Sequence, residues 1–169
     1  NNNATEKVYG MAEVYHFDTS TSLWTLVGQS LVNSTTTEGN SFGYDVDIND
    51  AGNIIAVSCY DGPAKIFQLD GSVWLQTAIF KDASYSFVSL NAAGNKVALG
   101  SLTATNPVTN TSFAGSAKVF ENNSGTWTQT GQTMYGTAFF SVFSRVRLNA
   151  EGNILAVGSE GLSNLMPKA

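Results

Sequence analysis

The sequence predicts an all-β fold made of repeated units of short antiparallel strands, and three observations support this class. The chain has 169 residues, of which 43% are hydrophobic and only 12% are charged, about half the charged share of an average soluble protein. It contains 16 glycines and few prolines, with Asn, Ser and Thr between short apolar runs, as in strands separated by turns. One pattern of residues also returns along the chain, and no stretch keeps a helical period.

Each copy of the repeat is an apolar segment, a turn with Asn and Gly, and a second apolar segment. The copies occupy residues 42–58, 87–100 and 145–158. The turn glycines that define the repeat are Gly52, Gly94 and Gly152. A second recurring unit occupies residues 12–15, 64–67 and 117–120, and each copy of it is followed by a tryptophan. These tryptophans are Trp24, Trp74 and Trp127, so the period is about 50 residues.

Within the middle copy the expected elements follow one another in a simple order. Residues 45–48 alternate polar and apolar side chains, which is the two-residue period of a strand. Residues 49–52 favour a turn, because Asn and Asp bond to their own backbone and Gly accepts positive φ. Residues 54–58 are an apolar strand covered on both faces. Residues 64–68 alternate again, and residues 73–76 run back after another turn.

Four short antiparallel strands in every repeat of about 40 to 50 residues are typical of β-propeller blades. We expect residues 1–41 to hold the last two strands of a first blade, and residues 42–83 and 84–142 to be complete blades. Residues 143–169 would hold the first two strands of a further blade and the start of the next loop. The chain is therefore expected to be two full and two half-blades of a larger or oligomeric propeller. A β-solenoid is the alternative, but its coils are shorter and need no Trp hairpin.

The repeat resembles a known group of propeller proteins. The repeat begins with Phe42-Gly43 and a strand, continues with an Asn/Asp-x-x-Gly-Asn turn, and ends with Ala-Val-Gly/Ser. This pattern is similar to the FG-GAP-type repeat of integrin-α-like propellers, and more closely to secreted or cell-surface repeat proteins of microbes and algae. Residues 115–120 and 127–131 resemble the continuation of that repeat. WD40 repeats share the turn, but their Trp-Asp ending is absent. The resemblance implies an extracellular, cell-surface or luminal location.

The calcium loop of integrin-type blades is not retained. Asp45 and Asp47 match the first two aspartates of such a loop, but Asp50 stands at the position of the turn glycine. The corresponding residues of the last repeat are Arg145 and Arg147, and arginine does not ligate calcium. We therefore expect neither a metal nor a cofactor.

Other candidate chemistry in the sequence is sparse. His16 and Cys59 have no recognisable catalytic partners, and neither a phosphate-binding loop nor a nucleophile elbow occurs. Asp45 and Asp47 are two carboxylates on one strand face, but sibling repeats do not keep them. We expect a protein that is not an enzyme, although an active site in further blades stays open. The net charge of −5 disfavours nucleic-acid binding, and no apolar run approaches the roughly 20 residues of a membrane span.

Two groups of residues are candidates for contact with protein partners. Asp45 and Asp47 correspond to Arg145 and Arg147 at the other end of the array, so two copies of the chain could pair these charges in a six-bladed ring. The simpler expectation is a longer chain that supplies the remaining blades. Among the long loops, 29–41, 102–115 and 132–141, the last carries Phe139 and Phe140, which suggest a buried contact with a neighbour.

Glycans are a further candidate partner. Asn-x-Ser/Thr sequences, the acceptors of N-linked glycans, occur at Asn3, Asn33, Asn110 and Asn122. The three tryptophans could instead stack on sugars, but one Trp per repeat more often packs between blades. The sequence thus predicts a non-catalytic structural or adhesive protein-interaction module, with a glycan-binding, lectin-like propeller as the alternative.

Overall fold

A computed structural model describes residues 10–33, 41–60 and 62–159, and this part of the chain contains strands and no helix. The strands are β1 (Met11–Ala12), β2 (Tyr15–Asp18), β3 (Leu23–Leu26), β4 (Leu31–Val32), β5 (Val46–Ile48), β6 (Ile54–Val57), β7 (Ala64–Asp70), β8 (Val73–Phe80), β9 (Phe87–Leu90), β10 (Lys96–Ser101), β11 (Ser116–Asn123), β12 (Thr126–Tyr135), β13 (Phe143–Leu148) and β14 (Leu155–Ser159).

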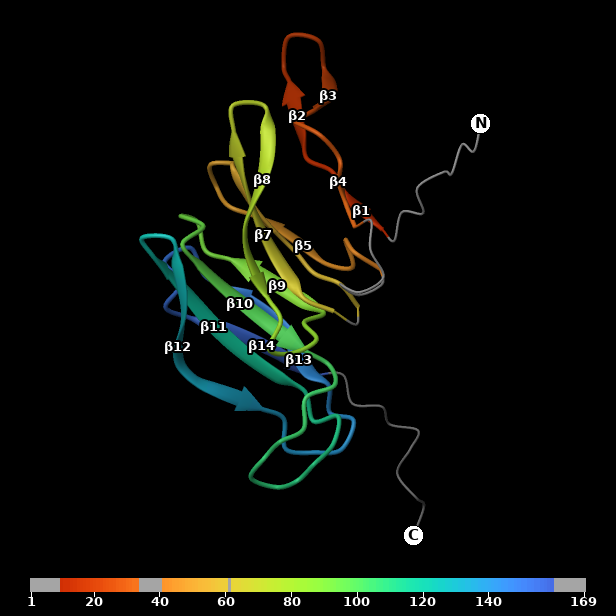
Figure 1. The fold of residues 1–169 in the computed structure, drawn as a ribbon, viewed down its shortest axis with the longest axis vertical. Helices are drawn as coiled ribbons and strands as arrows, with labels where there is room; N and C mark the ends of the chain where they lie inside the picture. Colours follow the sequence, from red (N-terminus) through yellow and green to blue (C-terminus); the bar gives the residue numbers. More distant parts are fainter. Residues whose placement is uncertain (1–9, 34–40, 61, 160–169) are drawn as a thin grey trace, which may run out of the picture.

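Two complete four-stranded sheets form the middle of the molecule (Figure 1). Strands β5 to β8 make one sheet and β9 to β12 the next, each antiparallel and in chain order. Strands β13 and β14 form a two-stranded sheet after them. Before them, one hairpin contains β1 paired with β4 and β2 paired with β3, and its tip projects at the top of Figure 1. The predicted all-β fold of four-stranded antiparallel units is confirmed.

An Asn side chain stabilises the turn between the first two strands of each blade, because it hydrogen-bonds to backbone N–H groups of the turn. The Asn49 side-chain oxygen accepts hydrogen bonds from the backbone N–H groups of Asn53 (3.0 Å) and Ile54 (2.9 Å), and its amide donates to the Asn53 side chain. Asn149 makes the same three bonds, and Asn91 a closely similar set. The turn glycines Gly52, Gly94 and Gly152 have φ values of +69°, +72° and +69°, which glycine adopts without a steric penalty.

The sheets pack face against face, with an apolar layer between each pair. The β5–β8 and β9–β12 sheets enclose Ile66, Tyr85, Val97 and Leu99. The hairpin packs on the opposite face of the β5–β8 sheet through Ala12 and other residues. On the far face of the β9–β12 sheet, β13 and β14 form a third apolar layer. Since both faces of each central sheet are covered, ionised side chains have few places there, which explains the low charge of the sequence.

Backbone hydrogen bonds also join successive blades at one end. The N–H of Asp50 donates to the carbonyl of Ala92 (3.1 Å), and the N–H of Ala92 donates to the carbonyl of Ala150 (3.0 Å). These three residues occupy the same position of the repeat, after the turn Asn. The turns therefore form a ladder that steps from blade to blade.

One predicted loop is shorter than expected. Residues 132–135 belong to β12, because Met134 and Tyr135 pair with Ala117 and Ser116 beyond a bulge. The loop 102–115 lies between β10 and β11 as expected. Within 29–41, Leu31 and Val32 form β4, and residues 34–40 lie outside the described residues.

Candidate functional site

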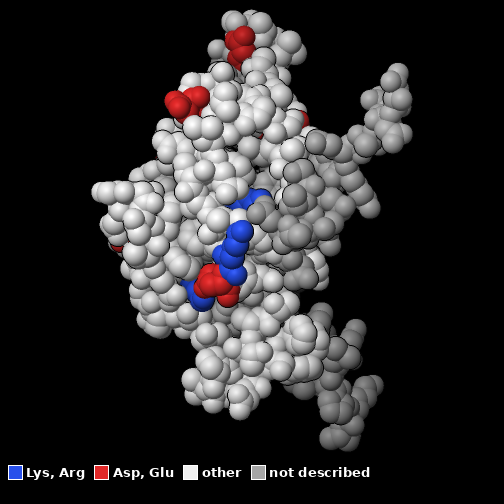
Figure 2. All heavy atoms as spheres, viewed as in Figure 1, with Lys and Arg blue, Asp and Glu red and all other residues white. Residues whose placement is uncertain are grey.

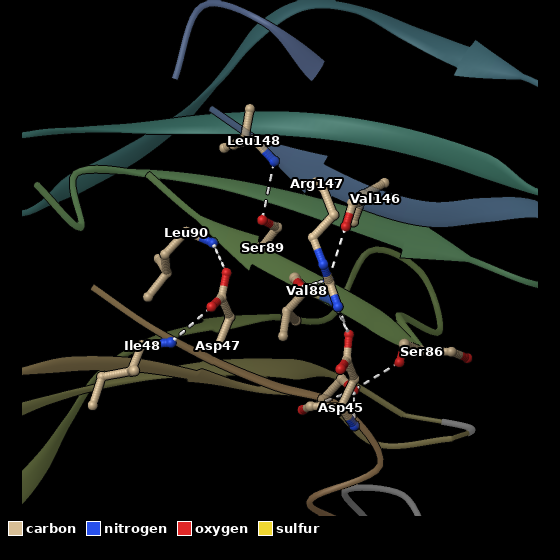
Figure 3. A network of polar contacts seen from close by, with 11 residues as sticks. Asp45, Asp47, Ile48, Ser86, Val88, Ser89, Leu90, Val146, Arg147 and Leu148 are labelled. Atoms are coloured by element: carbon tan, nitrogen blue, oxygen red, sulfur yellow. Dashed lines mark hydrogen bonds and ion pairs between the residues drawn. The ribbon is translucent and has the colours of Figure 1, made fainter. Parts of the chain in front are cut away.

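The first strands of the blades, β5, β9 and β13, are joined by side chains that bond to the backbone of the next blade (Figure 3). The Asp45 carboxylate accepts a hydrogen bond from the Val88 N–H (3.0 Å), and the Asp47 carboxylate accepts one from the Leu90 N–H (2.7 Å). Ser89, the counterpart of Asp47 in the next repeat, accepts one from the Leu148 N–H (3.0 Å). We call Asp45, Asp47, Ser89 and Arg147 the axial network.

Arg147, the last member of the axial network, donates hydrogen bonds instead of accepting them, because a guanidinium group has no hydrogen-bond acceptor. The Arg147 guanidinium turns back and donates to the carbonyls of Val88 (3.2 Å) and Val146 (2.9 Å). It also lies 3.9 Å from the Asp45 carboxylate. Arg145 lies over the Phe87 ring, at 4.7 Å from the ring centroid.

Asp45 and Arg147, which were expected to pair between two copies, form an ion pair within one chain. The pairing between copies stays a prediction. The inner strands converge closely enough that a side chain can reach across an intervening blade. The carboxylates of Asp45 and Asp47 are occupied as acceptors for backbone N–H groups, which explains these aspartates without acid–base chemistry. Among the described residues, no three His, Cys, Asp or Glu side chains are grouped so as to hold a metal ion.

A second polar cluster, which the sequence did not indicate, joins the two complete blades. Tyr85 is fully buried and donates to the Asp82 carboxylate (2.8 Å), while Lys118 pairs with the same carboxylate. Burial raises the pKa of Tyr85, and the bond to Asp82 raises it further. Partial burial opposes ionisation of Asp82, but bonds from Lys118 and Tyr85 outweigh it and hold the pKa of its carboxyl below the usual value. The cluster fixes the connection between β8 and β9.

Two of the three tryptophans pack against the preceding blade. Trp74 is buried, and its indole N–H donates to the carbonyl of Val27 (2.8 Å). Trp127 is half-buried with its ring 5.8 Å from that of Phe80. Trp24 is 67% exposed, with only Phe17 of its own hairpin beside it. Packing thus accounts for two tryptophans, and the third has no blade in front of it among the described residues.

Gln29 holds Trp74 in place, a contact that was not expected from the sequence. Its side-chain amide donates to the Trp74 carbonyl (2.8 Å) and accepts from the Trp74 N–H (2.9 Å). Gly28 beside it allows the close approach, because a Cβ there would lie 2.7 Å from the indole ring. The signal was present as the Trp-x-x-x-Gly-Gln pattern, which occurs at residues 24–29 and 127–132.

The loops after β10 and β12 lie at the lower end of Figure 1. Their phenylalanine side chains form an aromatic cluster. Phe140 stacks on Phe113 with ring centroids 5.0 Å apart and planes within 5°, and Phe139 packs edge-on against Phe140. Phe139 is 61% exposed within the chain, and the contact with a neighbour that was expected there stays a prediction. The loops carry these rings on backbone that Asn106 and Ser141 tie together by bonds to Gly136 and Ala114.

The four predicted glycan acceptors differ in their surroundings. Asn110 is exposed in a turn with positive φ, and Asn122 is half-buried and bonds to the Gly125 N–H. Asn33 is buried, which leaves little room for a glycan. Asn3 lies outside the described residues. Of the described acceptors, Asn110 is the most accessible.

Among the described residues, nothing covers the strand edges and apolar faces at the two ends of the array. Val46 and Ile48 on β5 are 48% and 41% exposed, whereas their counterparts Val88 and Leu90 on β9 are buried. Beside β5 runs a groove of about 270 Å³. It is lined by Glu13, Val14, Tyr15, Val46, Asp47, Ile48 and Ile55.

A second groove, of about 400 Å³, lies beside β13 and β14 and reaches back to the preceding blades. Its lining includes Asp45, Phe87, Arg145, Arg147, Ala156 and Gly158. In the described residues β14 pairs only with β13, whereas the corresponding strands β6 and β10 have partners on both sides. Each end thus presents half of a blade.

The surface is weakly charged. Figure 2 shows a face that is mostly uncharged, with a small group of basic and acidic side chains near its centre. His16 lies exposed on β2, and Cys59 is fully buried. The described residues form no helix, and so none that is long and apolar enough to cross a membrane.

No family model matches the chain, and no curated protein matches it. Among solved structures it is similar to the β-propeller domain of Cps50 (Swd1) from Myceliophteria thermophila, with 13% sequence identity and a TM-score of 0.56. The match covers 92% of this chain and 50% of that one, so the chain spans half the length of that structure. The likeness shows the propeller fold and not the FG-GAP-type repeat in particular. The chain is a β-propeller segment, with two complete blades and two half-blades among its described residues.

Proposed function

We propose that this chain is a non-catalytic structural or adhesive interaction module, a propeller segment that binds other protein segments through its incomplete ends and loops. The observation that carries the proposal is the pair of open half-blades. The uncovered edge of β14 and the exposed Val46 and Ile48 are features that the two complete blades bury. A strand edge and an apolar face left open together favour pairing with another segment.

The FG-GAP-type pattern of the repeat supports a place in a secreted, cell-surface or luminal assembly. The exposed Asn110 would carry a glycan there. The loop cluster of Phe113, Phe139 and Phe140 offers a second docking surface, because loops carry specificity on rigid β scaffolds.

One observation favours the alternative of a glycan-binding propeller, namely the exposed Trp24. An exposed indole is a good platform for stacking on a sugar. Against it, Trp74 and Trp127 pack between blades, so the chain lacks a ring of exposed tryptophans.

Two measurements on the intact chain test the proposal. A glycan array with wild type and Trp24→Ala should show no specific binding, and a glycan that binds wild type but not the variant would move the function to the lectin class. Cross-linking mass spectrometry of the protein in its natural material should place protein contacts on residues 10–33 or on β14. Cross-links confined to the outer strands β8 and β12 would contradict binding through the half-blades.

A further inference from the structure

The two half-blades are complementary halves of the same unit. The hairpin of residues 10–33 contains the last two strands of a blade, and β13 with β14 contains the first two. In the complete blades the second strand pairs with the third, as Ala56 pairs with Ile66 and Ala98 with Val119. The corresponding residues of the half-blades are Ala156 and Val14. We propose that a second copy of this chain supplies the missing half, so that β14 of one copy pairs with β1 and β2 of the other.

The Trp-containing hairpins support a copy of this chain as the occupant. In the hairpin of residues 10–33, Met11 pairs with Val32 and Ala12 with Leu31, beyond a bulge that holds Gly28 and Gln29. In the third blade, Ser116 pairs with Tyr135 and Ala117 with Met134, beyond a bulge that holds Gly131 and Gln132. The two hairpins have the same register and the same Gly-Gln dipeptide in the bulge. The hairpin of the second blade differs, with Ile66 paired to Ala78 and no Gly-Gln.

The Gly-Gln dipeptide of one blade contacts the Trp of the following blade. Gly28 and Gln29 hold Trp74 by close approach and two hydrogen bonds. Gly131 has no atom within 4 Å of the position of a Cβ, and Gln132 is exposed. The blade that follows β12 is the half-blade β13–β14, and a second copy would add Trp24 to it. The exposed Trp24 would then lie on Gly131 and Gln132 of the first copy, as Trp74 lies on Gly28 and Gln29.

The apolar faces at the two ends also match. Val46 and Ile48 line the groove beside β5. Arg145 and Arg147 lie on β13, with their guanidinium groups turned toward Phe87 and Val88 of their own chain. In the composite blade the outer face of β13 would cover Val46 and Ile48 of the second copy, with arginine stems over apolar surface. The turn ladder would continue as well, because Ala150 of one copy would meet Asp50 of the other.

Two copies are enough to close the ring. The described residues of one copy supply two blades and two complementary halves, so those of two copies supply six blades, within the range of about four to eight blades seen in propellers. One chain spans half the length of the propeller structure it resembles. The two junctions are identical by two-fold symmetry, which leaves no open edge for further growth. This inference rests on the proposed function, for which it names the partner.

The first test is the mass of the purified chain by light scattering and sedimentation over a range of concentrations. We expect a species of twice 17.9 kDa. Trp24→Ala should weaken the dimer by about tenfold or more, because a buried interface tryptophan carries much of the binding energy. Gln132→Ala should weaken it too, while Gln29→Ala, its counterpart inside the chain, should lower stability instead. Circular dichroism checks that each variant is folded.

A disulfide tests the register directly. The double variant Val14→Cys with Ala156→Cys should give covalent dimers on non-reducing gels. Directly opposed residues bring their Cβ atoms to about 4.5–5.5 Å, near the Cβ separation that a disulfide needs. Val14→Cys with Ile154→Cys is the control two residues out of register and should link poorly. Cys59 is buried and should not compete.

Three results would overturn the inference. They are a folded monomer at every concentration, an assembly that is not a dimer, and equal cross-linking of the two cysteine pairs. If the chain stays monomeric while its half-blades cross-link to another protein or chain segment, the second copy is wrong and the proposed function stands. If a monomer shows no such contacts either, both fail.

Discussion

Replacement of Gly100 by alanine tests whether close contact between the second strand of one blade and the first strand of the next controls stability. Gly100 lies on β10 opposite Phe87. A Cβ on Gly100 would lie 1.6 Å from the carbonyl oxygen of Ser144 and 2.7 Å from its carbonyl carbon. Contact between non-bonded heavy atoms needs about 3.5 Å, so β13 would have to move by roughly 2 Å.

The expected loss of stability depends on which atoms must move to make room for the new Cβ. Overpacking costs about 1–3 kcal/mol when side chains can adjust. Here the obstacle is backbone, and Ser144 and Val146 beside it are buried, so we expect the upper end, about 3 kcal/mol. For a chain of this length the melting temperature falls by about 2–4 °C per kcal/mol, hence by about 6–12 °C.

The assay is thermal and urea unfolding followed by circular dichroism, at one protein concentration for all variants because assembly would shift the midpoint. Gly158→Ala is the matched control, since Gly158 occupies the same repeat position and its Cβ would lie 3.4 Å from Arg145. In the monomer the control should change stability by less than about 0.5 kcal/mol. A Gly100→Ala protein as stable as the control would refute the proposed contact between the blades.

Three further predictions concern other contacts. Asp47→Ala leaves the buried Leu90 N–H without its acceptor and should cost about 1–3 kcal/mol in urea unfolding, whereas Asp50→Ala at an exposed turn should be nearly neutral. Trp74→Ala should cost about 3–5 kcal/mol and Trp24→Ala less than about 1 kcal/mol in the monomer, and equal losses would contradict their different burial. The lowered pKa of Asp82 means that its stabilising effect is present above the unfolded pKa and is lost as pH falls through the folded one. The difference in unfolding free energy between wild type and Asp82→Asn should therefore shrink below about pH 4, and a difference that stays constant on acidification would argue against the pairing.

The repeat made most of the fold predictable. Turn chemistry at Asn49, Asn91 and Asn149 is local, since each Asn bonds to residues four or five positions ahead. Alternation of apolar residues assigns strand faces without knowledge of the partner strand. Both signals lie within one repeat, so a single sequence can show them.

The candidate site was less predictable, because its contacts join residues far apart in the chain. Asp45 and Asp47 differ from their counterparts in sibling repeats, which made them seem available for a partner. In the structure they accept N–H groups 43 residues ahead. Their neighbours depend on the spacing between blades, which no local pattern encodes.

The sequence by itself determined the repeat, the four-stranded unit, the turn glycines and the half-blade at each end, because each depends on residues close together in the chain. Only the tertiary structure decided which tryptophan is exposed, that Gln29 holds Trp74, and that Arg147 reaches Asp45 within one chain. These features arise when whole sheets pack against one another, and the distance between two sheets is set by all the side chains between them. The same packing leaves two unlike half-blades open, and their complementarity is visible only when both are seen together.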